Sequence, residues 1–302
     1  MLRAALLVLV AAATVAVLDE PVASPMPKPA PRPVTGTLAP PKPDGPTALG
    51  HFAPGACLAY PPAGGDRGRT VLVDAGHGGP DPGTSAVTTT GPGLSEKDAT
   101  LPVALASAQL LRSRGYRVVL SRTTDSTVIP LAPDDLDGNV LSAEGKHADL
   151  LARATCANLA GAAALISIHF DGYPDSSVGG ALTLYDAARP FSAASLALAT
   201  LLQQNLTTAL AANGTPVTNR GVTTDDTAGG GEITAPGTAY GHLTILGPRS
   251  PGYVDDPSQM PAALVEPLFL TNPAECAIAA SVTGQQVIAG AIADAVTAFL
   301  TG

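Results

Sequence analysis

The chain has 302 residues, of which 16 are Lys or Arg and 25 are Asp or Glu, so its net charge at pH 7 is −9. Hydrophobic residues make up 45% and charged residues only 14%, which excludes a disordered chain, since disorder goes with few aliphatic residues and much charge. The acidic balance also argues against a nucleic-acid partner, because the chain carries no excess of Lys and Arg to displace counterions from phosphates.

Residues 1–20 predict a secretory signal peptide. Arg3 supplies a positive start, and the predominantly apolar run Ala4–Leu18 of 15 residues follows. This run is short for a membrane-spanning helix, which needs about 20 apolar residues, and fits the apolar core of a signal peptide. An uncleaved anchor is the alternative. Either way we expect an exported protein, in the periplasm, cell envelope or medium, with no stable membrane span after processing.

Residues 21–48 predict an extended linker, because they hold 10 of the 29 prolines. Proline removes amide donors and fixes φ, so this stretch does not build a helix or a sheet. Such a tether would let an exported enzyme reach a surface polymer, although an inert linker has the same composition. We expect the catalytic domain to occupy residues 49–302.

Strands and helices alternate along this domain. Short apolar runs rich in β-branched residues predict strands, and apolar residues at helical spacing predict helices. Together they indicate a single α/β domain whose mixed, mostly parallel sheet has helices on both faces. The predicted strands are Thr70–Asp74, Tyr116–Ser121, Ala164–His169, Gly180–Tyr185, His242–Leu246 and Ala262–Glu266; the predicted helices are 100–115, Leu150–Leu159, Phe191–Asn213 and Gln285–Leu300.

Polar residues gather where three of these strands end. His77 follows the first strand, His169 ends the third, and Glu266 ends the last. In open α/β sheets the ligand site lies at the carboxyl ends of the strands, so we expect these side chains at one edge, with Glu96 just before a helix. Two His and one carboxylate, with one position left to water, are the ligands of a catalytic zinc site, and a second carboxylate suits a general base.

Each of these residues also has an ordinary explanation. The Gly-rich turn around His77 lacks the spacing of a dinucleotide-binding loop, and Asp81 would repel a phosphate. His169 alone fits a hydrogen-bonded strand end, and Glu96 alone fits an acid at a helix start. Glu266 lies in a strongly apolar run, where a carboxylate needs a cation or a role. Taken together, the four residues favour a metal site.

Four segments, in this order, carry a resemblance to a known family. They resemble the motifs of the zinc-dependent N-acetylmuramoyl-L-alanine amidases, the type-3 amidase family of bacterial cell-wall hydrolases, over about residues 69–302. The resemblance implies Zn²⁺ held by His77, Glu96 and His169, with Glu266 as the catalytic carboxylate. The segments are VLVDAGHGGPDPG (71–83), LSEKDATLPVALASAQLLRSRGYRVVLSRTTD (94–125), LISIHFDG (165–172) and ALVEPLFLTNPAEC (263–276).

Two further residues are implied to lie near the substrate. Arg220 belongs to a segment that resembles the family's R-G-V motif near the cleft, and Asp171 stands where the family often has Asn. The reaction implied is hydrolysis of the amide bond between the lactyl group of N-acetylmuramic acid and L-alanine, in peptidoglycan or muropeptides, by a monomer. A zinc carboxypeptidase on stem peptides and a non-catalytic wall-binding homologue remain as alternatives.

Loops and cysteines complete the expectations. Residues 126–147 predict a polar rim, residues 223–240 a mobile loop near the site, and His147 and His242 loop histidines. Three cysteines allow one disulfide in an exported protein. Pairing Cys57 with Cys156 would tie the segment before the first strand to the domain and leave Cys276 free, but sequence does not fix the connectivity.

Overall fold

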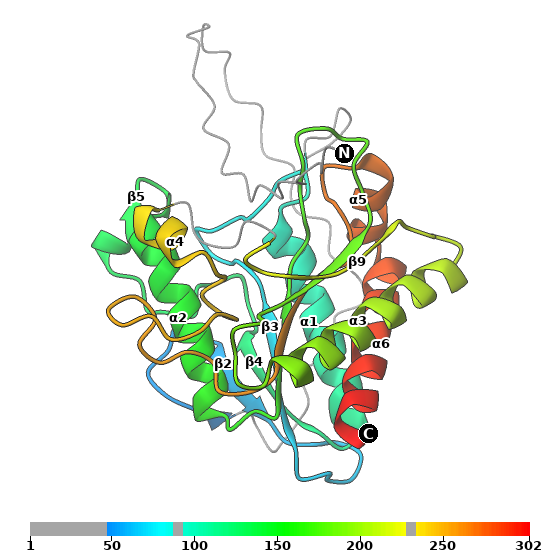
Figure 1. The fold of residues 1–302 in the computed structure, drawn as a ribbon, viewed down its shortest axis with the longest axis horizontal. Coiled ribbons are helices and arrows are strands. Elements are labelled where there is room, and N and C mark those ends of the chain that lie inside the picture. Colours follow the sequence, from blue (N-terminus) through cyan, green and yellow to red (C-terminus); the bar gives the residue numbers. More distant parts are fainter. Residues whose placement is uncertain (1–46, 87–92, 228–233) are drawn as a thin grey trace, which may run out of the picture.

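A computed structural model describes residues 47–86, 93–227 and 234–302 (Figure 1). The predicted signal peptide and all but the last two residues of the predicted linker lie outside the described residues. The described part forms an α/β fold around an eight-stranded sheet with the order β1-β2-β4-β3-β7-β10-β8-β9. Its strands are β1 Thr47–Ala48, β2 Ala56–Tyr60, β3 Thr70–Ala75, β4 Arg117–Arg122, β7 Ala164–Ile168, β8 Ala181–Tyr185, β9 Asn219–Thr224 and β10 Ala262–Glu266.

Strand direction divides the sheet into two parts. The neighbours β4, β3, β7 and β10 are parallel, with Asp74 opposite Ser167 and Val265 opposite Ile168. Strand β8 is antiparallel to β10, and β9 is parallel to β8. The carboxyl ends of β3 and β7 therefore lie at the edge where β10 ends, which we name the β10 carboxyl edge. The carboxyl ends of β8 and β9 lie at the opposite edge, the β10 amino edge.

Helices cover both faces of this sheet, as predicted. Helices α1, α3 and α6 pack together on one face, against alternate strand residues such as Val71 and Val73. Helix α2 and the segment 241–261 cover the other face, against Leu72 and Leu264. Because side chains alternate across a strand, the two apolar clusters share the same strands. The helices are α1 Glu96–Ser113, α2 Ala143–Leu159, α3 Ser192–Ala212, α4 Ala235–Tyr240, α5 Pro273–Ala280 and α6 Val282–Thr301.

The predicted start of the helix at Thr100 was wrong, because α1 begins at Glu96. A helix that starts at Thr100 would have Pro102 in its first turn, whereas Pro102 lies inside α1. The amide of Glu96 donates to the Thr84 carbonyl and that of Lys97 to the Pro82 carbonyl. The loop before the helix therefore satisfies amides that a capping side chain would otherwise serve, and the helix extends to include Glu96.

The predicted strand His242–Leu246 was also wrong. Its apolar run is flanked by two glycines, and Gly241 takes the left-handed conformation that ends α4. The amides of Leu246 and Gly247 both donate to the Leu243 carbonyl, so the run closes as a turn instead of pairing with a strand. Ile245 and Leu246 are buried against the α2 face of the sheet.

The two predicted loops contain regular structure. The rim at 126–147 holds a short 3-10 helix, Pro133–Asp135, and a hairpin of β5 Leu136–Asp137 and β6 Val140–Leu141, and its last residues open α2. The loop at 223–240 holds the end of β9 and all of α4, and its centre lies outside the described residues. Strands β1, β2 and β9 and helix α5 were not predicted.

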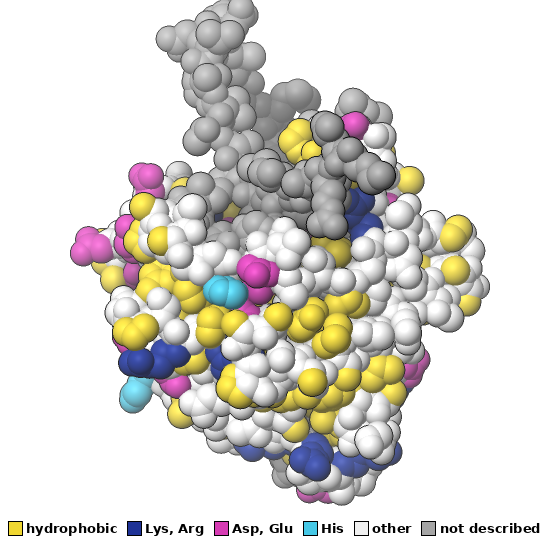
Figure 2. Space-filling model, viewed as in Figure 1, with side chains coloured by type: hydrophobic (Ala, Val, Ile, Leu, Met, Phe, Trp, Pro, Cys, Tyr) yellow, Lys and Arg dark blue, Asp and Glu magenta, His cyan; other side chains and the backbone are white. Residues whose placement is uncertain are grey.

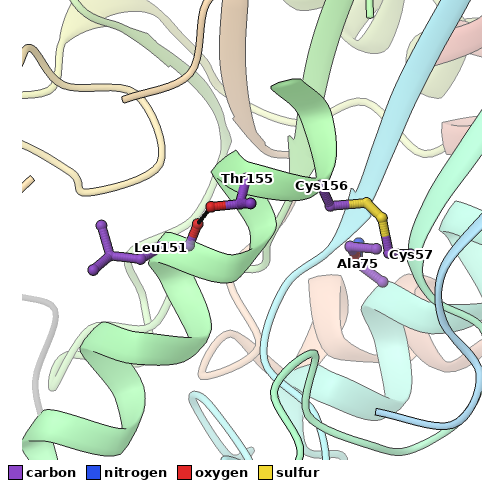
Figure 3. Close-up of a disulfide and its surroundings, with 6 residues drawn as sticks. Cys57, Ala75, Leu151, Thr155 and Cys156 are labelled. Atoms are coloured by element: carbon purple, nitrogen blue, oxygen red, sulfur yellow. Dashed lines mark hydrogen bonds between the residues drawn. A yellow bond between two sulfur atoms is a disulfide. The ribbon is translucent and has the colours of Figure 1, made fainter. Parts of the chain in front are cut away.

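The predicted pairing of the cysteines is confirmed. Cys57 of β2 and Cys156 of α2 form a disulfide between residues 99 positions apart (Figure 3). Cys276 is a free, buried thiol. The disulfide joins the carboxyl-terminal end of α2 to the antiparallel strand that precedes the parallel part of the sheet.

Charged side chains are few and scattered on the face drawn in Figure 2, as the low charged share predicts. Within the described residues no single helix is long and apolar enough to span a membrane; α5 and α6 reach that length and composition only together, with a bend of 82° between them.

Candidate metal centre

Three side chains predicted as metal ligands meet at the β10 carboxyl edge. His77 follows β3, His169 follows β7, and Glu96 opens α1. One potential ligand atom from each residue lies within 4.8 Å of the others. The parallel pairing of β3 with β7 delivers the two histidines, and the early start of α1 delivers the carboxylate.

A single carboxylate oxygen connects the two imidazoles. Oε1 of Glu96 lies 3.0 Å from Nε2 of His77 and 2.9 Å from Nδ1 of His169, and it also accepts the amide of Phe170 at 3.0 Å. Oε2 of Glu96 accepts the amide of Thr84 at 2.9 Å. Glu96 is 3% exposed, so its position is fixed from the protein side on both oxygens.

Asp81 orients His77, and sequence reasoning had considered it only as an obstacle to phosphate. Its Oδ2 lies 2.7 Å from Nδ1 of His77. A carboxylate on the second nitrogen fixes the tautomer and the ring plane of a ligand histidine. The spacing His77-x-x-x-Asp81 in a Gly-rich turn was the available signal, but only the turn brings the two together.

Charges in the cluster shift several pKa values. Burial alone would lower the pKa of His77, but Glu96 and Asp81 outweigh it and raise this pKa to about 10. Burial would raise the pKa of Asp81, but His77 holds it at about 2. The pKa of Glu96 is likewise held well below its usual range, against burial, chiefly by His77 and by hydrogen bonds from both histidines. Both carboxylates are therefore ionised, which is the form that Glu96 needs in order to bind a metal ion.

Glu266 ends β10 beside this cluster, and one of its carboxylate oxygens has no hydrogen-bond partner among the described residues. Its Oε2 is buried and accepts no hydrogen bond from any described residue. Burial, then Asp171 and Glu96, raise its pKa well above the usual range for Glu. A buried carboxyl with a raised pKa and a free oxygen can take up a proton and return it.

Asp171 and Arg220, the residues predicted near the substrate, lie at the same edge. Oδ2 of Asp171 is buried and has no hydrogen-bond partner in the described chain, and burial together with Glu96 raises the pKa of this carboxyl to about 6. Arg220 of β9 donates to the Gly179 carbonyl at 3.1 Å, and its guanidinium lies 5.2 Å from the ring centre of Phe269. Glu96 raises the pKa of Asp171, whereas the positive charge of Arg220 lowers it.

A buried ionic network supports the turn that carries His77. Arg153 of α2 donates to Asp74 at 2.7 Å, to the Ala75 carbonyl at 2.7 Å and to the His77 carbonyl at 2.8 Å. Asp149, one turn earlier on α2, accepts two further hydrogen bonds from the same guanidinium. Charge-assisted hydrogen bonds of this kind are strong and directional, so Arg153 fixes the backbone of the turn to α2.

Glycine is required at two positions around the cluster. A Cβ on Gly76 would lie 2.5 Å from the His169 ring, and one on Gly83, where φ is +65°, would lie 2.5 Å from Glu96 Oε2. His77 itself has φ +57°, a conformation that costs an ordinary residue about 1–2 kcal/mol. The backbone therefore accepts strain where it presents this imidazole.

The donor set fits a divalent metal ion such as Zn²⁺. Two imidazoles and a carboxylate are a common protein ligand set for catalytic zinc. Three acidic side chains (Glu96, Asp171 and Glu266) converge at the edge, and two of them keep a buried oxygen without a hydrogen bond among the described residues. A cation would compensate these oxygens.

The remaining histidines lie apart from this cluster. His147 belongs to α2, where its ring stacks on Tyr253 with centroids 4.0 Å apart. His242 lies between α4 and the turn that replaces the predicted strand, beside Asp186. His51 is exposed near β1.

Several known proteins are similar in sequence to this chain. A family model described as N-acetylmuramoyl-L-alanine amidase matches residues 71–298. The germination-specific N-acetylmuramoyl-L-alanine amidase of Bacillus subtilis is 35% identical over 118 residues, which cover 39% of this chain and 45% of that protein. The N-acetylmuramoyl-L-alanine amidase AmiC of Neisseria meningitidis is 28% identical over 261 residues, covering 79% of this chain and 55% of that protein. The chain thus spans about half the length of these curated relatives.

Solved structures show the same fold. The CwlD amidase of Clostridioides difficile, in complex with the GerS lipoprotein, is 25% identical with a TM-score of 0.57, covering 77% of this chain and 98% of that one. An N-acetylmuramoyl-L-alanine amidase from Clostridium difficile 630 is 26% identical with a TM-score of 0.54, covering 78% and 97%.

Proposed function

The chain belongs to the N-acetylmuramoyl-L-alanine amidase family, and we propose that it is a zinc-dependent hydrolase of peptidoglycan. In this proposal it cleaves the amide bond between the lactyl group of N-acetylmuramic acid and L-alanine. One observation carries the proposal: Glu266, with a buried oxygen that has no hydrogen-bond partner among the described residues, faces a complete His77–Glu96–His169 donor set.

His77, Glu96 and His169 would hold the metal ion. When bound, Zn²⁺ supplies Lewis-acid polarisation of a carbonyl and lowers the pKa of water at the site. Asp81 keeps Nδ1 of His77 engaged, which leaves Nε2 directed toward Glu96 and the ion. The Arg153 network holds the backbone of the same turn, so the donor atoms are positioned before the substrate arrives.

Glu266 performs the proton transfers. Its carboxylate accepts a proton from the attacking water as the new C–O bond forms at the lactyl carbonyl. It then donates this proton to the nitrogen of L-alanine as the C–N bond breaks, which releases a free carboxylic acid and a free amine. One group can serve both steps because it alternates between its two protonation states.

Asp171 and Arg220 would bind the substrate. Asp171 keeps a buried oxygen free of hydrogen bonds from the described residues, and it can accept from an amide or hydroxyl of the muropeptide. Arg220 places a positive charge near Asp171, where it can pair with a carboxylate of the stem peptide.

We propose that the enzyme acts outside the cytoplasm, with residues 1–20 as a signal peptide and 21–48 as a linker. Its substrate would be the cell wall, and a disulfide such as Cys57–Cys156 forms and persists in oxidising compartments.

Digestion of purified muropeptides, followed by mass spectrometry, tests this function. The expected products are free stem peptides that begin with L-alanine, together with intact glycan, and EDTA should abolish their formation. The matched control is Glu266→Gln, which removes the proton acceptor and keeps the size of the side chain. Loss of a terminal amino acid instead would indicate a carboxypeptidase, and no change of the substrate would indicate a non-catalytic wall-binding protein. Either of these two results overturns the proposal.

A further inference from the structure

A second cluster of one histidine and two carboxylates lies away from the candidate metal centre. Asp186 follows β8, Asp225 follows β9, and His242 follows α4. One potential ligand atom from each lies within 4.8 Å of the others. Strands β8 and β9 are parallel, with Tyr185 opposite Thr224, so the two aspartates leave the sheet side by side.

This cluster is at the β10 amino edge. Leu184 pairs with Leu264 and Leu182 with Glu266, so continuing the antiparallel register brings Asp186 level with Ala262. That position is four residue steps along β10 from Glu266, which is roughly 13 Å of strand. The cluster is therefore too distant to share an ion or a substrate atom with the His77 centre.

Both carboxylates are buried, and one oxygen lacks a hydrogen bond. Asp186 is 2% exposed and Asp225 is fully buried. Oδ1 of Asp186 accepts the Ala188 amide, but Oδ2 has no hydrogen-bond partner in the described chain although Nδ1 of His242 is only 2.8 Å away. His242 Nδ1 and Asp186 Oδ2 therefore lie close together without the geometry of a hydrogen bond. Ligand atoms that share one cation have this arrangement.

His242 cannot satisfy both aspartates by hydrogen bonding alone. Its Nδ1 lies 2.8 Å from Asp186 Oδ2 and 3.5 Å from Asp225 Oδ1, and one ring nitrogen carries at most one proton. Around a tetrahedral ion with bonds of about 2.0–2.1 Å, neighbouring donor atoms lie roughly 3.4 Å apart. The two distances from His242 Nδ1, 2.8 Å and 3.5 Å, lie on either side of that value.

The surroundings are electrostatically negative. Burial and then Asp186 raise the pKa of Asp225 to about 6. Burial and then both aspartates also raise the pKa of Tyr240, whose ring lies 5.3 Å from that of His242. Arg189 interacts electrostatically with Asp186. Two of its nitrogens donate to the carbonyls of Gly247 and Ser258, and its buried Nε has no hydrogen-bond partner among the described residues. One positive charge therefore faces two carboxylates.

We propose that Asp186, Asp225 and His242 form a second metal site, which binds a divalent first-row ion such as Zn²⁺ or Mn²⁺. An imidazole nitrogen together with carboxylate oxygens selects these ions over Ca²⁺ and Mg²⁺, which prefer oxygen ligands alone. The ion is structural: it joins the ends of β8 and β9 to the turn after α4, which covers the α2 face of the sheet. In this way it fixes a segment that has no strand pairing of its own.

Metal stoichiometry tests the proposal. The purified full chain is stripped with EDTA, reloaded with Zn²⁺, desalted and measured by mass spectrometry of the metal. We expect about two ions per chain in the wild type, about one in His242→Ala and about one in His77→Ala. His51→Ala, which removes an exposed histidine, is the matched control and should keep about two. A single ion that His77→Ala removes and His242→Ala leaves in place would overturn the proposal.

A second measurement covers the case in which His242→Ala does not fold. In the His77→Ala background only the second site remains, and added Zn²⁺ should raise the melting temperature, because an ion that binds only the folded state stabilises it. Adding the isosteric substitution Asp225→Asn to this background should abolish the rise. If Zn²⁺ leaves the melting temperature of the His77→Ala variant unchanged, the second site does not exist, whatever the muropeptide assay shows for the first.

Discussion

The two edges of the sheet carry similar groups in different ways. At the β10 carboxyl edge, His77 and Glu96 are held by Asp81, by the amides of Thr84 and Phe170, and by the Arg153 network. At the β10 amino edge, Asp225 is held by the amides of Asp226 and Leu243, while His242 stands on a turn beside α4. The first cluster is braced by α1 and α2, whereas the second depends on a turn with no strand partner.

This difference indicates different roles. A site that must position a substrate within a fraction of an ångström needs a rigid support. The carboxyl edge has one, together with a Glu266 oxygen that has no hydrogen-bond partner among the described residues. A site that only joins segments needs donors and a cation, and it gains its rigidity when the ion binds.

The largest effect is expected for the pair Glu266→Gln and His77→Ala. Both variants should lose activity by about 10²–10⁴-fold or more, since the first loses the proton acceptor and the second a metal ligand. Only His77→Ala should lose the ion at the carboxyl edge. Activity assays combined with metal analysis check this, and a Glu266→Gln protein that lost its metal would make Glu266 a ligand instead.

Removing the disulfide should lower stability and leave both metal sites intact. The double substitution Cys57→Ser and Cys156→Ser opens a loop of 99 residues and should lower the free energy of unfolding by about 3–5 kcal/mol. Urea unfolding measures this loss. Cys276→Ser, which changes a free buried thiol, is the control. If the disulfide variant lost one metal ion, α2 would support that site through its carboxyl-terminal end as well.

Asp81→Asn should weaken metal binding at the carboxyl edge alone. The amide still reaches Nδ1 of His77 but no longer favours the required tautomer, so affinity should fall by about 10–100-fold. Competition with a chelator measures the affinity. The second site should keep its affinity in the same titration, and equal weakening of both would show that the substitution acts through the fold as a whole.

The smallest effect is a pH dependence of stability that comes from Asp225. Its pKa is about 6 in the folded chain against an ordinary value of 3.8, so between these values the folded state binds the proton more tightly. In EDTA, stability should therefore be highest below about pH 4 and fall as the pH rises through 6, by on the order of 2 kcal/mol. Asp225→Asn should remove this slope, and Asp255→Asn, at an exposed aspartate, should not. A slope that persists in Asp225→Asn would assign it to another group.

The sequence by itself determined the parallel part of the molecule and which polar side chains end its strands. Apolar β-branched runs specified β3, β4, β7 and β10, and parallel strands end at the same edge, so His77, His169 and Glu266 were expected together. The motifs around them carried the resemblance to the family, and the pairing of Cys57 with Cys156 was among the expected possibilities.

The tertiary structure decided what depended on non-local pairing. Local patterns do not reveal that β8 runs antiparallel to β10, and this direction alone sends Asp186 and Asp225 to the opposite edge. The run after Gly241 has the composition of a strand, yet two glycines and the Leu243 carbonyl close it into a turn that brings His242 to those aspartates. The start of α1 at Glu96 likewise depended on amide contacts with the 82–84 loop. Strand propensity is a short-range property, whereas strand direction, register and turn closure depend on partners far away in the chain.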